Sequence, residues 1–83
     1  MKQYMIVPRK SQWHMLVDGQ EPGLIRHDSR EFVISMAAAL AALHDDSIAV
    51  YSESGQLAFA TQFRSGLAVP ADGMSNTFQE RAP

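Results

Sequence analysis

One alanine-rich helical segment, from about Asp28 to His44, constrains the fold of this chain more than any other part of the sequence. Five of its residues are alanines, which favour helix and allow close approach to a neighbouring layer. Asp28 and Glu31 have the spacing of a capping box, with Asp in place of Ser or Thr, and they predict where the helix begins. An apolar stripe predicts the side that faces the core, and it consists of Phe32, Met36, Leu40 and Leu43, with Val33, Ala37 and Ala41 beside it.

Two strands are predicted before the helix. Residues 3–8 form an apolar run, and Pro8 ends it because proline cannot donate a hydrogen bond to a neighbouring strand. Residues 12–18 alternate along the chain, which places Trp13, Met15 and Val17 on one face and His14, Leu16 and Asp18 on the other. Turn-forming residues dominate 18–23, and residues 24–26 form either a short third strand or an extended link.

A hairpin is predicted after the helix. Residues 47–52 and 57–63 are rich in β-branched, aromatic and other apolar side chains, and Gly55 between them suits a positive φ. We therefore assign residues 1–63 to one domain. Residues 64–83 contain two Gly, two Pro and several Ser, Asn and Asp, and they predict a C-terminal tail that is extended or partly disordered.

These elements predict an α+β fold. An antiparallel sheet of four or five strands packs one face against the single helix, in the order β-β-(β)-α-β-β. The other face has no second helix to cover it, and a partly apolar uncovered face is typical of an interface. The predicted core consists of Met5 or Ile6, Trp13, Met15, Val17, Phe32, Met36, Leu40, Leu43, Ile48, Val50, Leu57 and Phe59.

Composition limits the class of protein. The 83 residues suffice for one small domain with a modest core, which self-association often stabilises further. The chain has no cysteine, so it forms no disulfide and offers no thiolate to zinc, and we expect it in the cytoplasm. A formal net charge of -2 argues against nucleic-acid binding. No apolar run approaches the roughly 18 residues of a membrane span, so we expect no membrane association.

No pattern typical of an enzyme occurs. The three histidines lack ligand spacing, and there is no Gly-x-Ser-x-Gly elbow or Gly-rich phosphate loop, so we predict no enzyme, catalytic residue, cofactor or metal site. We interpret His44, Asp45 and Asp46 as a solvated helix end rather than a weak divalent-cation site. Trp13 suits either a binding platform with a basic rim or a core position under the helix, and we favour the core because Met15 shares its face.

The order of these motifs resembles a known family. A strand ending at Pro8, the pattern Trp13-x-Met15-x-Val17, a capped alanine-rich helix and a Gly55 hairpin are similar to the small bacterial domain-of-unknown-function family 2188, over residues 3–63. The resemblance implies a β-β-α-β-β unit and no assigned catalytic residue. This chain departs from the family at Ser54, where Asp or Asn is expected, and at Phe32, which lies early in the helix.

The leading hypothesis is a non-enzymatic interaction module that pairs with a second copy or another protein through the open sheet face, an edge strand or the tail. The surface assigned to this contact consists of His14, Leu16, Tyr51, Arg9, Lys10 and Arg26. The first alternative is a nucleic-acid-associated accessory protein that uses Arg9, Lys10, Trp13, Arg26 and Arg30. The second alternative is a small-ligand or enzyme site formed at a dimer interface around His14 or His44.

Overall fold

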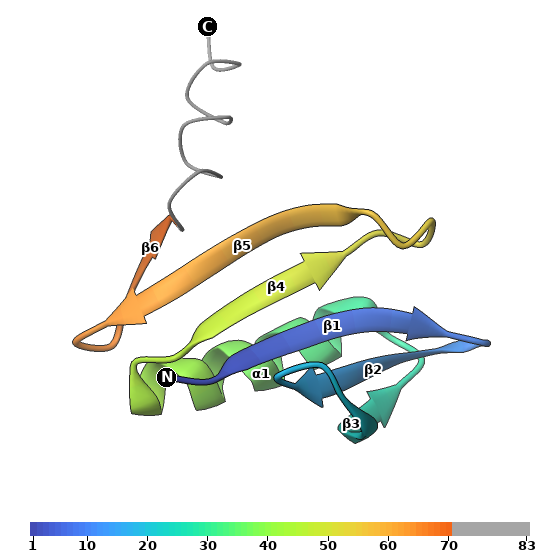
Figure 1. Ribbon diagram of the computed structural model, residues 1–83, viewed down its shortest axis with the longest axis horizontal. Coiled ribbons are helices and arrows are strands. Elements are labelled where there is room, and N and C mark those ends of the chain that lie inside the picture. Colours follow the sequence, from blue (N-terminus) through green and yellow to red (C-terminus); the bar gives the residue numbers. More distant parts are fainter. Residues whose placement is uncertain (71–83) are drawn as a thin grey trace, which may run out of the picture.

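The structure of the protein is a computed structural model that describes residues 1–70, and it consists of one sheet and one helix (Figure 1). The strands before the helix are β1 (Gln3–Arg9), β2 (Gln12–Val17) and β3 (Gln20–His27). The helix is α1 (Arg30–His44), and the strands after it are β4 (Ser47–Tyr51), β5 (Leu57–Arg64) and β6 (Leu67–Pro70). Within these described residues, no helix has the length and apolar character that a membrane crossing requires.

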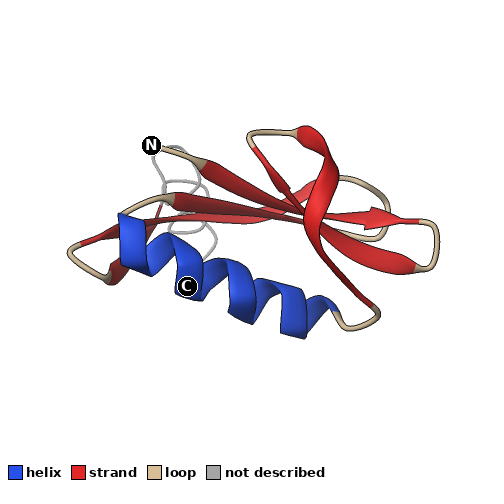
Figure 2. Cartoon of the chain, turned by 90° about the horizontal axis from the view of Figure 1, so that it is seen from below, coloured by secondary structure: helices blue, strands red, loops and turns tan. Residues whose placement is uncertain are grey.

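The sheet joins two antiparallel meanders at its centre. The strand order is β3-β2-β1-β4-β5-β6, and β1 and β4 run parallel, with Gln3 opposite Ser47 and Ile6 opposite Val50. Helix α1 connects the two meanders and covers one face of the sheet (Figure 2). The α+β class is confirmed, but the sheet has six strands rather than four or five, and it is mixed rather than wholly antiparallel. The parallel pair arises because α1 carries the chain back to the starting end of β1.

Strand β3 is longer than the sequence predicted, because only Asp18 and Gly19 form the turn before it. The pairing of β2 with β3 shifts register between Met15 and Val17, so residues of β3 bulge out of the ladder. Gly23 lies in this bulge, where a Cβ atom would come within 2.9 Å of the carbonyl oxygen of Met15. The turn-forming residues that argued for a loop therefore serve a bulged edge strand.

The hairpin of β4 and β5 is confirmed, and Gly55 in its turn has φ 87°. A bulge changes the register so that Val50 opposes Phe59 whereas Tyr51 opposes Leu57. Since directly opposed residues point to the same side, Leu57 leaves the face that holds Phe59 and is 45% exposed. The prediction that Leu57 belongs to the core was wrong for this reason.

The region assigned to a tail contributes to the sheet. Residues Leu67–Pro70 form β6, which pairs antiparallel with β5, and Arg64 opposes Leu67. The rest of the predicted tail, residues 71–83, lies outside the described residues.

The core lies between α1 and the sheet, and the inner side of α1 consists of Val33, Ala37 and Ala41, each with no exposed surface. The predicted stripe was wrong at three positions, because Phe32, Met36 and Leu43 are 44%, 40% and 77% exposed. Alanine side chains let α1 approach the sheet closely, so the larger core side chains come from the strands. The buried cluster from the sheet is Tyr4, Ile6, Met15, Ile48, Val50 and Phe63, with Trp13, Val17, Leu40 and Phe59 partly buried against it.

The first residue of the helix also differs from the prediction. Ser29 caps α1, and its hydroxyl oxygen accepts a hydrogen bond from the backbone N–H of Phe32 at 3.2 Å. Asp28 does not cap the helix; its carboxylate accepts a hydrogen bond from the Gln12 side chain instead. Ser29 has the extended backbone that a capping residue needs, whereas Asp28 lies one residue too early.

Candidate functional site

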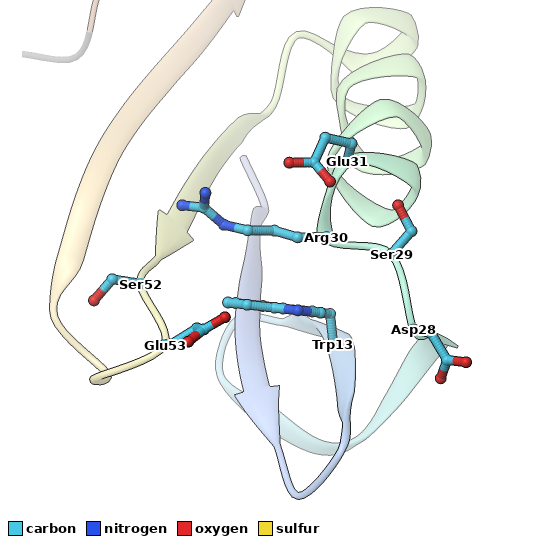
Figure 3. A pocket seen from close by; sticks show the side chains of 7 residues that line it. All are labelled: Trp13, Asp28, Ser29, Arg30, Glu31, Ser52 and Glu53. Carbon is cyan, nitrogen blue, oxygen red and sulfur yellow. The ribbon is translucent and has the colours of Figure 1, made fainter.

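A polar hollow lies where the carboxyl ends of β1 and β4 meet the start of α1. Its volume is about 460 Å³, and the lining residues are Trp13, Asp28, Ser29, Arg30, Glu31, Ser52 and Glu53 (Figure 3). A neighbouring hollow of about 420 Å³ shares Trp13, Asp28 and Glu53 and reaches the turn between β1 and β2. We call the two together the Trp13 hollow.

Arg30 and Trp13 form the centre of the Trp13 hollow. The guanidinium carbon of Arg30 lies 5.4 Å from the ring centroid of Trp13, which is a cation–π distance. Figure 3 shows the Arg30 side chain extended over the ring, with Glu53 at the far edge of the ring. The Nε atom of Arg30 is buried and has no hydrogen-bond partner among the described residues. Trp13 packs against the core, as we predicted, and its edge also lines this hollow.

The Trp13 hollow is lined by polar and charged side chains around one aromatic ring. Its side chains supply three carboxylates, three hydroxyls, one guanidinium, one ammonium and one amide, and no histidine lines it. The hydroxyl oxygen of Ser29 accepts a hydrogen bond from the backbone N–H of Phe32, and the hydroxyl of Ser52 lies 2.8 Å from that of Ser54. Within residues 1–70, no group of three histidine or acidic side chains is placed to hold a metal ion.

Four of the six residues that we assigned to an interaction surface come together on the open sheet face. His14 opposes Val7 of β1 and Arg26 of β3, so these side chains point away from α1. A hollow of about 350 Å³ is lined there by Arg9, Lys10, Ser11, Gln12, His14 and Arg26, and we call it the basic hollow. It brings three cationic side chains and one imidazole to a single place.

The other two predicted surface residues lie elsewhere on that face. Leu16 is only 2% exposed, so it supports the face from within. Tyr51 is half-buried and lines a smaller hollow of about 240 Å³ with Met5 and Val7. The open sheet face is thus divided into an apolar part over β1 and β4 and a basic part over β2 and β3.

The five residues of the nucleic-acid alternative do not share one face. Trp13 and Arg30 lie on the side of α1, whereas Arg9 and Arg26 line the basic hollow on the opposite side. Lys10, in the turn between β1 and β2, lines hollows on both sides.

The sequence analysis missed the outer side of α1. The residues Phe32, Met36, Ala39 and Leu43 are all exposed and follow one another at intervals of four, three and four residues. These intervals average about 3.7 residues, close to the 3.6 residues of one helical turn, so the four residues form a single stripe along the helix. We call these four residues the α1 seam. The signal was present in the sequence, but its three large residues, Phe32, Met36 and Leu43, were assigned to the core.

Asp46 is a buried structural group rather than part of a solvated helix end. It is 5% exposed, and its carboxylate accepts hydrogen bonds from the backbone N–H of Lys2 at 2.9 Å and the hydroxyl of Tyr4 at 3.2 Å. The hydrogen bond from Lys2 lowers the pKa of Asp46 against the opposing effect of burial, and the bond from Tyr4 and the nearby His44 lower it further. Burial raises the pKa of Tyr4, and the neighbouring Asp46 raises it further.

The remaining histidines are apart from one another. His27 stacks on Phe32 with 4.2 Å between ring centroids, and its Nδ1 accepts a hydrogen bond from the backbone N–H of Ser29. His44 ends α1 and is exposed, whereas His14 lines the basic hollow.

Comparisons of this chain with protein-family models, with curated proteins and with solved structures found no match. The resemblance to family 2188 therefore stays a prediction.

Proposed function

We propose that the protein is a non-enzymatic interaction module of the cytoplasm that forms a homodimer through the α1 seam. The observation that carries this proposal is the exposure of Phe32, Met36 and Leu43 on one side of the only helix among the described residues. Burying a large apolar side chain contributes about 1.5–3 kcal/mol, so three such side chains on one stripe favour association.

A second copy of the chain suits the α1 seam. Two such helices packed antiparallel place the Glu31 end of one beside the His44 end of the other, where opposed helix dipoles favour contact. Ala39 lies between the larger Met36 and Leu43, and small residues let two helices approach. The seam runs over about 16 Å of helix at 1.5 Å per residue, so the dimer should dissociate on dilution.

The open sheet face suits self-association less well. Its exposed apolar residues are scattered, since Tyr51 lines a small hollow, Leu57 lies near the β4–β5 turn and Leu67 lies on the edge strand β6, and Leu16 is already buried within the protein. A symmetric contact through this face would also bring two basic hollows to one interface, and like charges brought together there oppose association.

The test is the solution mass of the full chain, measured by light scattering on a sizing column over a range of concentrations. Leu43→Glu places a charge in the α1 seam, and we expect it to weaken the dimer at least about tenfold, since burial of one leucine contributes more than 1.4 kcal/mol. Leu67→Glu is the matched control, because Leu67 of β6 is 70% exposed and Leu43 is 77% exposed.

Each result has one meaning. A concentration-dependent dimer that Leu43→Glu dissociates and Leu67→Glu preserves supports the proposal. Dissociation by Leu67→Glu alone would instead assign the contact to the edge strand β6. A full chain that stays monomeric at the highest concentration would overturn the proposal.

A further inference from the structure

We infer that the basic hollow on the open sheet face binds a phosphate group carried by a small phosphorylated molecule. The inference is independent of the proposed dimer, because the basic hollow and the α1 seam lie on opposite sides of the sheet. It rests on the residues that the strand register brings together, on their ionic partners and on the chemistry of the lining.

The register of β1, β2 and β3 builds the basic hollow from two rows of side chains. Arg9 opposes Gln12 in one row, and His14 opposes Arg26 in the next. Alternation along β2 places Gln12 and His14 on the same face, so the two rows are neighbours. Lys10 lies in the turn beside the first row and has φ 57°, which directs the chain sharply between the strands. The hollow therefore stands on paired strands rather than on a long loop.

The positive charge of the basic hollow is only partly balanced. Glu21 accepts a hydrogen bond from Nε of Arg9 at 2.9 Å, and one terminal nitrogen of Arg9 forms an ion pair with the same carboxylate at 2.8 Å. The other terminal nitrogen of Arg9 donates to the carbonyl of Pro8, which fixes the guanidinium in place. Within the described part of the chain, neither Lys10 nor Arg26 has an ionic partner. Two positive charges thus remain for a ligand.

The lining suits phosphate in particular. A phosphate monoester carries up to two negative charges and several acceptor oxygens, which Lys10, Arg26 and the hydroxyl of Ser11 can bind from different directions. His14 also lines the hollow, and its buried Nδ1 has no hydrogen-bond partner among residues 1–70. No carboxylate lines the basic hollow, whereas the Trp13 hollow is lined by three that would repel an anion.

A free phosphorylated molecule fits better than a nucleic-acid backbone. Two uncompensated cations match the charge of one monoester, whereas a backbone needs a row of cations along its path. The other basic residues near the hollow do not extend such a row, because Arg30 lies over Trp13 on the opposite side of the sheet. The formal net charge of -2 also opposes long-range attraction of a polyanion.

The test is a nuclear magnetic resonance titration of the full chain with inorganic phosphate, at constant ionic strength and with chloride as the reference anion. We expect saturable shifts of the backbone amides from Lys10 to His14 and of Arg26. Arg26→Gln should weaken binding by about tenfold, because it removes a charged hydrogen-bond donor. Lys10→Asn is a second variant that keeps the turn, since Asn tolerates a positive φ.

Arg64→Gln is the matched control, because Arg64 is an exposed arginine at the end of β5 and does not line the basic hollow. Unchanged binding in this variant supports the site. Shifts that do not saturate, or that Arg64→Gln weakens as much as Arg26→Gln does, would overturn the inference as general screening by the anion.

A second titration then separates the two sources of phosphate. A pentose 5-phosphate that binds at least as tightly as inorganic phosphate supports a small phosphorylated ligand. A single-stranded oligonucleotide that binds more tightly than both, with a steep dependence on salt, would overturn that part of the inference and assign the hollow to a backbone. The Leu43→Glu variant should bind phosphate normally, so a failure of the proposed dimer remains distinguishable from a failure of this site.

Discussion

The two sides of α1 differ in side-chain size, and the side with the larger apolar residues is not the side that packs on the sheet. The side that packs on the sheet consists of Val33 and two alanines, all without exposed surface, whereas the side that faces outward carries Phe32, Met36 and Leu43. A helix can pack closely on a sheet when its own side chains are small and the strands supply the bulk. Bulk on the outer side then has no role in the core of one copy, which is why we assign it to contact with a second copy.

The largest effect is expected when the same larger side chain is introduced on each side of α1. Ala37→Leu forces a larger side chain against the sheet and should lower the free energy of unfolding by about 1–3 kcal/mol, as overpacked cores do. Ala39→Leu, two residues away on the exposed side, should change it by less than about 0.5 kcal/mol. Urea unfolding followed by the fluorescence of Trp13, at low protein concentration, measures both.

The two variants are each other's control. Both add three carbon atoms to an alanine of the same helix, so helix propensity hardly differs between them. Equal destabilisation by the two would contradict the assignment of inner and outer sides.

A second prediction concerns the start of α1, where the capping residue fixes the directions in which the two sides of the helix face. Ser29→Ala removes the acceptor for the backbone N–H of Phe32 and should lower the free energy of unfolding by about 1 kcal/mol. Asp28→Ala removes an exposed hydrogen bond to Gln12 and should have a smaller effect. Chemical denaturation measures both variants. A larger loss with Asp28→Ala would mean that the capping box expected from the sequence forms after all.

The smallest expected effect concerns the end of α1, where Asp46 joins the helix to β1. Because the pKa of Asp46 is lowered in the folded protein, the unfolded chain takes up a proton first as the pH falls. The stability that Asp46 contributes is therefore present above a pH of about 4 and lost as the pH falls through the folded-state value. Asp46→Asn should lower the urea midpoint at neutral pH and leave it nearly unchanged in acid, where the wild-type carboxyl is protonated.

Urea midpoints measured from neutral pH down to acid test this prediction. The effect is modest because asparagine keeps a carbonyl oxygen that can accept from Lys2. A difference between the two proteins that stays constant across the range would show that the charge of Asp46 is not the stabilising feature.

Local patterns predicted most of the secondary structure. Alternation identified the face of β2 that carries Trp13 and Met15, and Gly55 marked the turn of the hairpin. The pairing of β1 with β4 has no such local signal, because it depends on how α1 returns the chain. The bulged strand β3 was underestimated because Pro22 and Gly23 suit a turn as well as an irregular edge.

The candidate sites were predictable in part. Arg9, Lys10, His14 and Arg26 were assigned to a surface, and the register of three strands brings them to one hollow. Trp13 and Arg30 were grouped only within the nucleic-acid alternative, and their direct contact has no local signal because the cap at Ser29 decides where the first turn of α1 projects its side chains. The buried side of α1 was predicted wrongly. A stripe of large apolar side chains is more hydrophobic than a row of alanines, so the pattern assigned the large side chains to the core.

The parallel pairing of β1 with β4 also bears on the order in which the chain assembles. Every other strand pair of the described sheet joins neighbours in sequence, whereas β1 keeps one edge open until β4 has been made. During synthesis the first meander therefore emerges with an unprotected edge, and α1 delivers the strand that closes it. If the chain is divided between β3 and α1, one half holds β1 and the other holds β4. This junction is therefore where the domain is best suited to be cut and rejoined, or exchanged between copies.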